Sequence, residues 1–504
     1  MRAPAGVAPL VPALWLFAAF AAYVACFPNH LGDSDEPLIL YEAKRLLHGA
    51  VFYRDIFEIV TPGSQYFFAG LFGLFGTTLT TARIAMAGVQ AGIATLILIA
   101  SRSFAVRWSL ATAAALAHLA LAQPTWPYAS PHWLSALLLM LALVLALRRP
   151  WVAGGRGALA LGAVIGALAL VQQQQAAILL PTVAVVLICD RLLDRRYGVG
   201  ASAATLPALL LALLAGASAI AVPAIAVLAL GAGVEPLFEA LVRHPLTNYR
   251  ALHTAAKWGS VSVYSQALAR YTFPGLLRWQ PLVLLAVAAR AAHLGRQCTA
   301  EAEVRRLVML LILALGAMAS VSYFPDFIHL AFIAPLFLVG LAALLEVALG
   351  RLPRAAAAVV VAALLVALGA QAGRNLQRAY ATHPVHAQTP FGHIDLQTRD
   401  PLDLAEQFNR LLPPDAPREV FCYPECPALY LLSDTDNPTP YQKLLAGYNS
   451  PAALQAAIDA VEARRVPLAF GFFGPDTDPV ARYVHAHYTQ VGTSLFYVRK
   501  PDGN

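Results

Sequence analysis

Long apolar runs recur from the N-terminus to about residue 372, and shorter polar segments separate them. A bilayer core about 30 Å thick is crossed by about 20 apolar residues in a helix, whose backbone polar groups bond internally. Arg2 is the only charged residue before the first run, and no clear cleavage site follows the run. The first run therefore predicts a retained transmembrane helix and not a cleaved signal peptide. The pattern predicts eleven transmembrane helices, near residues 8–27, 83–101, 109–122, 129–147, 157–171, 176–190, 204–232, 279–292, 307–322, 327–349 and 355–372.

The placement of arginine orients these helices. Every second loop is rich in arginine, whereas the short loops at 123–128, 172–175 and 323–326 contain neither Lys nor Arg. The positive-inside rule assigns the arginine-rich loops to the cytoplasm. Eleven spans then leave the N-terminus in the cytoplasm and the C-terminus outside the cytoplasmic (inner) membrane. The large segments predicted to face outward are 28–82, 233–276 and 373–504.

Beyond residue 372 the pattern changes. Residues 373–400 are polar and rich in His, which predicts a linker. Helical patterns at 402–411, 451–464 and 477–487 then alternate with short apolar runs at 419–423, 466–473 and 494–499, as in a small α/β domain. We therefore expect a polytopic α-helical membrane domain over 1–372 and an extracytoplasmic α/β domain over 373–504.

Composition agrees with this division. Of the 504 residues 59% are hydrophobic and 12% charged, about half the charged fraction of a soluble globular chain. The net charge of +7 lies mostly in the predicted inner loops, which argues against a nucleic-acid partner and leaves the lipid bilayer as one. Cys422 and Cys426 lie four residues apart in the outer tail, where they could form a disulfide or be two separate small residues.

Three carboxylates occupy four residues directly after the first span, at Asp33, Asp35 and Glu36. Ser34 or Asp35 can cap a helix that ends at Gly49. The dipole of such a helix keeps a carboxylate at its N-terminus ionised, ready to accept a proton or, through Asp33 and Asp35, to hold a divalent cation. Plain N-capping is the alternative, although it needs only one of the three.

The same helix places Ile39, Ala43, Leu46 and Leu47 on one face, which predicts an amphipathic helix on the membrane surface. A second surface helix is expected in the apolar stretch that ends at Gly76. Arg54 could hold a phosphate or pair with a neighbouring acid. The polar groups that the loop keeps close to the bilayer are candidates for substrate binding: Tyr53, Arg54, Glu58 and Gln65.

Other outer segments contribute further candidates. The second outer loop carries Arg243, His244 and Arg250, and an outer turn carries glutamines from Gln172 to Gln175. Asp326 and His329 lie three apart on one helix face at the start of a span. Ionisable groups at membrane depth are functional candidates, and a structural pair that binds loop backbone is the alternative.

These motifs resemble the first loop of the GT-C membrane glycosyltransferases. The shared features are Asp35-Glu36 after the first span, a helix ending in Gly, Tyr53-Arg54-Asp55, a Pro62-Gly63 turn followed by aromatics, and a closing Leu74-Phe75-Gly76. The plan of the chain also resembles glycosyltransferase family 39-like proteins, which include protein mannosyltransferases and lipid A aminoarabinose transferases. The latter have Lys-Pro-Pro where this chain has Thr61-Pro62-Gly63, so their substrate is not carried over.

The resemblance implies an inverting transfer of a sugar from a polyprenyl-phosphate donor to a glycolipid, glycan or protein on the outer face. Asp35 or Asp33 would be the general base, and Glu36 would orient the acceptor or balance charge. Arg54, Arg243 and His244 would neutralise the departing phosphate. Gln172 and Gln175 could bind sugar hydroxyls, or simply satisfy an exposed turn.

Two other classes of function stay open. A transporter or flippase often shows two matched halves with interrupted helices, and no such repeat is apparent here. Transporters also rarely need an outer tail of about 130 residues or a charged outer loop of this size. A non-catalytic membrane scaffold or sensor is the second alternative.

Overall fold

In a computed structural model, the chain divides into two units, each built from three separate segments. The structure describes residues 10–32, 35–198, 204–249, 279–298, 300–322, 327–445, 447–474 and 478–501. The helical unit comprises residues 1–27, 84–224 and 256–379. The mixed unit comprises residues 28–83, 225–255 and 380–504.

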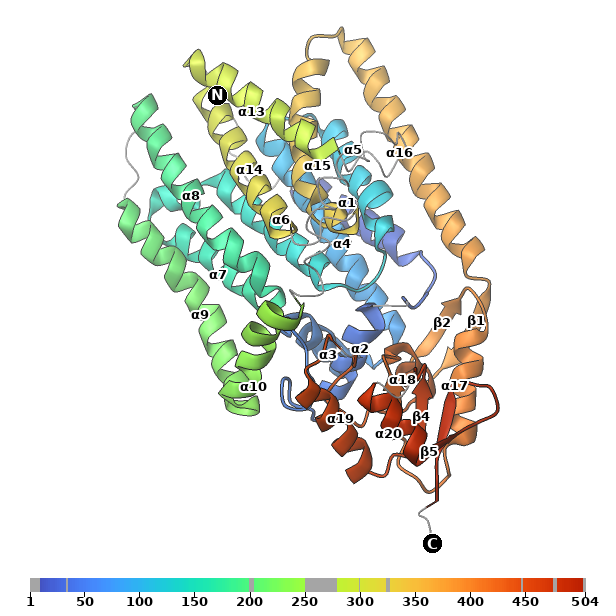
Figure 1. The fold of residues 1–504 in the computed structure, drawn as a ribbon. Coiled ribbons are helices and arrows are strands. Elements are labelled where there is room, and N and C mark those ends of the chain that lie inside the picture. The colour runs from blue at the N-terminus through green and yellow to red at the C-terminus, as the bar shows by residue number, and fades with distance from the viewer. Residues whose placement is uncertain are drawn as a thin grey trace. The chain divides into compact units, whose positions relative to one another are not determined.

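All eleven predicted spans are helical, which confirms these elements of the sequence analysis. In the helical unit α14 lies beside α8 and α13 (Figure 1). The helices are α1 (Leu10–Ala25), α4 (Leu79–Ser103), α5 (Trp108–Ala117), α6 (Pro131–Arg148), α7 (Arg156–Val171), α8 (Gln173–Tyr197), α9 (Leu206–Ala232), α13 (Gln280–Arg296), α14 (Glu301–Ser320), α15 (Phe327–Leu349) and α16 (Arg354–Thr382).

Length and composition identify a multi-pass membrane protein. Among the described helices six are long and apolar enough to cross a bilayer, namely α4, α6, α8, α9, α15 and α16. Helices α1 and α7 are apolar but shorter. The number of eleven spans and the orientation of the termini stay predictions.

Small residues bring α7 and α9 into backbone contact. A methyl group at Gly162 would overlap the carbonyl oxygen of Leu213, and one at Gly216 would overlap that of Leu159. Gly162 and Gly166 form a GxxxG pattern on α7. Such patterns let membrane helices approach closely, where van der Waals contact replaces the hydrophobic effect as the source of attraction.

A buried ionic cluster joins α8 to α14. Asp190 and Asp194 lie one turn apart on α8. Asp190 accepts a hydrogen bond from Arg305 at 2.5 Å, and Asp194 forms an ion pair with Arg305 at 2.9 Å. Arg149 reaches the same two carboxylates, at 2.8 and 2.9 Å. The indole N–H of Trp151 also donates to Asp190, at 2.8 Å. Since both acids are nearly fully buried, these partners compensate charges that would otherwise be strongly destabilising.

The first part of the mixed unit contains the two helices that the first loop predicts, α2 (Asp35–Leu47) and α3 (Gly63–Phe75). However, α2 is not a simple surface helix, because it packs against both α3 and α18 (Pro427–Ser433). Tyr41 and Lys44, which are not part of the predicted apolar face, are also buried. Tyr41 stacks on Tyr430 at 4.8 Å, and Lys44 donates to Asp434 at 2.6 Å. The segment after α9 forms α10 (Val234–Phe238) and the π-helical turns η4 (Glu239–Arg243) and η5 (Pro245–Tyr249).

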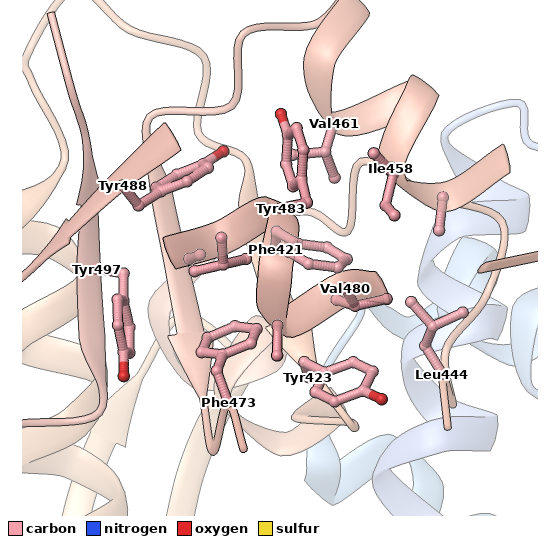
Figure 2. Close-up of a cluster of buried hydrophobic side chains, with 14 of the residues drawn as sticks. Phe421, Tyr423, Leu444, Ile458, Val461, Phe473, Val480, Tyr483, Tyr488 and Tyr497 are labelled. Carbon is pink, nitrogen blue, oxygen red and sulfur yellow. The ribbon is translucent and has the colours of Figure 1, made fainter. Parts of the chain in front are cut away.

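The tail is an α/β domain, as predicted. A four-stranded sheet has the order β3-β4-β6-β5, with β3 parallel to β4 and the other pairs antiparallel. Aromatic side chains such as Tyr423, Phe473 and Tyr497 fill its core (Figure 2). The elements are α17 (Asp400–Leu411), β3 (Val420–Tyr423), α18, α19 (Pro451–Ala463), β4 (Leu468–Gly471), α20 (Pro479–His487), β5 (Tyr488–Gln490) and β6 (Phe496–Arg499).

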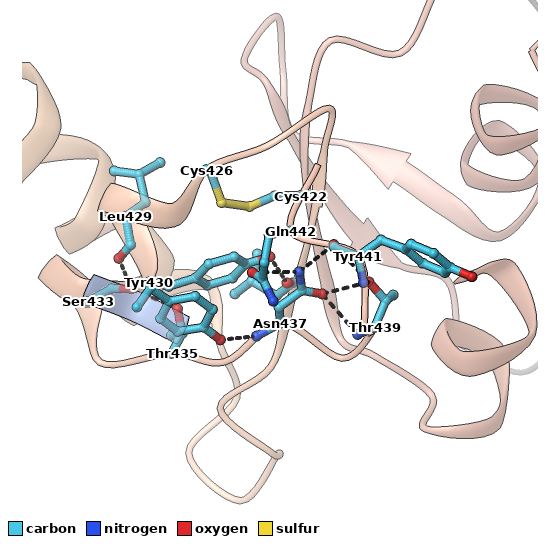
Figure 3. The surroundings of a disulfide bond; sticks show 12 residues. Cys422, Cys426, Leu429, Tyr430, Ser433, Thr435, Asn437, Thr439, Tyr441 and Gln442 are labelled. Atoms are coloured by element: carbon cyan, nitrogen blue, oxygen red, sulfur yellow. Dashed lines mark hydrogen bonds between the residues drawn. A yellow bond between two sulfur atoms is a disulfide. The ribbon is translucent and has the colours of Figure 1, made fainter. Parts of the chain in front are cut away.

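The linker predicted over 373–400 is wrong. Helix α16 continues to Thr382, and a hairpin of β1 (Val385–Thr389) and β2 (Gly392–Leu396) follows it. Cys422 and Cys426 form a disulfide at the end of β3 (Figure 3), which decides between the two alternatives that their spacing leaves open.

Candidate functional site

The candidate site of the mixed unit begins at the N-terminus of α2. Asp35 is the first described residue of this helix, and it is exposed. The helix dipole favours an ionised carboxylate at this position. Asp33, the other predicted base and cation ligand, lies outside the described residues. The described part of the acidic cluster therefore offers one accessible carboxylate, that of Asp35.

Glu36 has a different environment, because its buried carboxylate is bound by Arg83. Both terminal nitrogens of Arg83 donate to it, one of them to Oε2 at 2.8 Å. The backbone N–H of Gly32 donates to the same oxygen, also at 2.8 Å. Arg83 additionally binds the carbonyl oxygen of His30. Glu36 thus ties the start of α2 to the segment before it and to the start of α4.

Two further carboxylates of the unit are shielded from solvent, because Glu42 is buried and Glu58 is half-buried. Gln65 donates to Glu42 Oε2 at 2.9 Å, and within the described ranges no donor reaches Glu42 Oε1. Burial raises the pKa of Glu42, and the charge of Glu58 raises it further. Burial also raises the pKa of Glu58, to about 7, with a contribution from the charge of Asp35. The three acids therefore form one interacting group, in which burial and neighbouring charge favour the protonated forms of Glu42 and Glu58.

Glu58 and Gln65 are among the residues predicted from the sequence, whereas Glu42 is not. A signal for Glu42 exists, since it lies three residues after Ile39 and four before Leu46, on the apolar face of the helix. An acid in that position has to be buried together with the face.

Tyr53 shapes the loop that carries Glu58. It is buried with a left-handed backbone conformation, and its hydroxyl donates to the carbonyl oxygen of Val60 at 2.8 Å. Farther along, the N–H of Phe57 donates to the carbonyl oxygen of Pro440 at 2.8 Å. The tail around Pro440 is itself ordered by the Asn437 side chain, which accepts from the N–H of Thr439 at 2.9 Å (Figure 3). The hydrogen bond between Phe57 and Pro440 consequently fixes the first loop to the C-terminal α/β domain.

Arg54 forms the surface ion pair that the sequence leaves as one of two alternatives. Its guanidinium donates twice to Asp55, at 3.0 and 2.7 Å. Both residues line a cavity of about 480 Å³, a volume typical of small-molecule sites. The cavity is rich in charged and polar groups: Arg45, His48, Arg54, Asp55, Glu419, Asp436, Asn437, Thr439 and Arg464.

The described candidate residues of the second outer loop already contact other side chains of the protein. Arg243 is exposed and pairs with Glu235 at 3.0 Å and Glu239 at 2.7 Å. His244 is buried between Phe57 and Tyr448, with ring centroids 5.2 and 5.0 Å away. Burial lowers the pKa of His244, so at neutral pH it is uncharged. Arg250 lies outside the described residues.

In the helical unit, the structure brings together His329, Gln172 and His132. The amide of Gln172 donates to His132 Nδ1 at 2.9 Å, and its oxygen accepts from Ser135 at 2.9 Å. The His329 ring meets that of His132 edge-on at 4.8 Å. Gln175 is also buried, and Asp326 lies outside the described residues. The glutamine turn is therefore part of a buried polar cluster and not an exposed turn.

Comparisons with known proteins identify the fold. No protein-family model matches the chain, and no curated protein matches it either. Among solved structures, ArnT from Cupriavidus metallidurans in the apo state is similar over 98% of both chains, with a TM-score of 0.57 and 17% identity. The same protein bound to undecaprenyl phosphate is similar over 85% of this chain and 84% of its own, with a TM-score of 0.54 and 16% identity.

An oligosaccharyltransferase from Archaeoglobus fulgidus, in complex with Zn and sulfate, is also similar. It has a TM-score of 0.57 and 14% identity, over 96% of this chain and 73% of its own. ArnT, a lipid A aminoarabinose transferase, and this oligosaccharyltransferase are GT-C glycosyltransferases. The predicted GT-C-like architecture is confirmed, and at these identities the likeness concerns the fold.

Proposed function

We propose that this chain is a membrane glycosyltransferase that moves a sugar from a polyprenyl-phosphate donor to an acceptor on the outer face of the cytoplasmic membrane, with inversion at the anomeric carbon. Asp35 is the general base. The acceptor is a glycolipid, a glycan or a protein.

One observation carries the proposal: the exposed carboxylate of Asp35 at a helix N-terminus interacts with Glu58, which in turn interacts with the buried Glu42, in a chain with the GT-C fold. Burial raises the pKa of Glu42 and of Glu58, and the charge of Asp35 contributes to the shift at Glu58. Carboxyl groups with strongly shifted pKa values are typical of acid–base sites. The likeness to an ArnT structure bound to undecaprenyl phosphate supports a lipid-phosphate donor.

The reaction can be written with these groups. The acceptor hydroxyl oxygen attacks the anomeric carbon from the face opposite the phosphate, and its proton passes to the Asp35 carboxylate. The bond between that carbon and the phosphate oxygen breaks, and polyprenyl phosphate leaves with the electron pair. A positioned base of this kind contributes about 10²–10⁴-fold to the rate.

The cavity beside Arg54 is the proposed site for the polar part of a substrate. Arg45, Arg54 and Arg464 supply positive charge there, and planar guanidinium groups suit phosphate. Arg54 is a better phosphate ligand than Arg243, because Arg54 is held by one acid and Arg243 by two. A substrate phosphate would have to compete with Asp55 for Arg54.

The experiment is a transfer assay with the full chain in detergent or vesicles and a panel of polyprenyl-phosphate-linked sugars. Released polyprenyl phosphate and the anomeric configuration of the product are measured. We expect Asp35→Asn to lower turnover by about 10²-fold or more, because the amide cannot accept the proton. Asp35→Glu should restore part of the activity.

Glu406→Gln is the matched control, because Glu406 is an exposed acid of α17 in the same unit. It should transfer sugar at the wild-type rate. Full activity of Asp35→Asn would exclude Asp35 as the base, and a product with retained configuration would exclude the single displacement.

A further inference from the structure

The β1–β2 hairpin carries three side chains with metal-binding groups on one face. His386 lies directly across from Asp395 in the antiparallel register, and His393 precedes Asp395 by two residues. Alternate residues of a strand point to the same face, so all three project together. Their ligand atoms all lie within 4.8 Å of one another.

Both imidazoles converge on the same carboxylate oxygen. His386 Nδ1 lies 2.7 Å from Asp395 Oδ1, and His393 Nε2 lies 3.0 Å from it. The two rings are nearly parallel, with centroids 6.2 Å apart. Their side chains are 59% and 41% exposed, so an ion has access to this point from solvent.

The second carboxylate oxygen is fixed by the first loop. The backbone N–H of Asn29 donates to Asp395 Oδ2 at 2.6 Å, and the N–H of Asp395 donates back to the carbonyl oxygen of Asn29 at 2.7 Å. The Asp395 side chain is only 6% exposed. A supporting hydrogen bond of this kind orients a metal-ligating carboxylate and leaves its other oxygen for the ion.

We propose that His386, His393 and Asp395 bind a divalent transition-metal ion of the zinc class, through Nδ1, Nε2 and Oδ1 respectively. Zinc takes nitrogen and oxygen ligands at about 2.0–2.2 Å in a tetrahedron, which sets the ligand atoms about 3.3 Å apart. To reach this geometry the two nitrogens withdraw from Oδ1 by about 0.6 and 0.3 Å, and they approach each other by up to about 1.5 Å, since the ligand atoms lie within 4.8 Å of one another. Water completes the coordination on the exposed side.

The ion would link the two strands of the hairpin by coordinating residues of both, at the point where Asn29 contacts the hairpin from the start of the first loop. This site is separate from Asp35, and the inference does not depend on whether the chain transfers sugar. The alternative is that Asp395 simply accepts hydrogen bonds from both imidazoles, with no ion.

The test uses the full chain in detergent, with any purification tag removed and metal stripped by a chelator. Zn²⁺ binding is followed by calorimetry, and Co²⁺ is used as a probe because tetrahedral cobalt absorbs visible light. We expect one equivalent to bind with a dissociation constant of about 10 µM or less. His386→Gln and His393→Gln should each weaken binding by more than about tenfold.

One variant serves as the control. His485→Gln removes an exposed histidine of α20 in the same unit. It should bind Zn²⁺ like the wild-type chain. Asp395 is left intact, because its contacts with Asn29 are structural. Equal affinity in the His386, His393 and His485 variants, or no binding at about 100 µM Zn²⁺, would overturn the proposal.

Discussion

The buried ion pair between Glu36 and Arg83 holds the first turn of α2, and we expect its loss to open this part of the chain. Glu36→Gln keeps the size of the side chain but removes its charge. Arg83, whose side chain is 11% exposed, then loses its only described carboxylate partner. Breaking a buried pair from one side costs about 3–5 kcal/mol. That is a large part of the roughly 5–15 kcal/mol that stabilises a typical domain.

Cleavage by trypsin after Lys44 measures this opening. Lys44 is 9% exposed in the middle of α2, so trypsin can cleave after it only when this segment unfolds. The amount cleaved in a short pulse, identified by mass spectrometry, follows the population of the open form. A cost of about 3–5 kcal/mol should increase that population by about 10²-fold to 4 × 10³-fold, since each 1.4 kcal/mol is a factor of ten.

The exposed Arg54–Asp55 pair of the same loop is the matched control. Asp55→Asn should cost less than about 1 kcal/mol, because exposed ion pairs contribute little. The double variant Glu36→Leu, Arg83→Met removes both charges and should regain most of the protection. Wild-type protection of Lys44 in Glu36→Gln would refute this reasoning, and lost transfer activity in that protein would then make Glu36 a catalytic group.

Three further outcomes are expected. The pKa of Glu58 is raised to about 7 in the folded chain, so folding favours its protonated form. The wild-type chain should therefore lose stability as the pH rises from about 5 to 8. The melting temperature of Glu58→Gln should depend less on pH across this range. Arg305→Leu leaves Asp190 buried with less compensation and should cost about 3–5 kcal/mol, seen as a lower melting temperature in detergent. Gly162→Val should cost about 1–3 kcal/mol by forcing α7 from α9, whereas Gly88→Val, which meets open space, should melt as the wild type does.

Elements that depend on local pattern could be predicted from the sequence. The eleven apolar runs become helices because each satisfies its own backbone in an apolar setting. The ends of α2 follow from an acidic first turn and from Gly49, which adopts the left-handed conformation that ends helices. The strands of the tail follow from short apolar runs between helices.

Features that depend on distant partners could not be predicted. Tyr41 has the polar hydroxyl of a surface residue, but its partner Asp436 lies 395 residues farther along the chain. The hairpin after α16 could not be predicted because its strands are short and contain Ala, Gly and Asp, which are uncommon in strands.

The mixed unit draws on early, middle and late parts of the chain, and this has a consequence for its biosynthesis. Lys44 and its partner Asp434 are 390 residues apart. At about 5–20 residues per second, roughly 20–80 s separate the synthesis of the two. During that interval Tyr41 and Lys44 are without these partners. A chain that ends before Asp434 retains every predicted span, yet its first loop never acquires the contacts that surround Asp35, so only chains that extend past Asp434 gain the proposed activity.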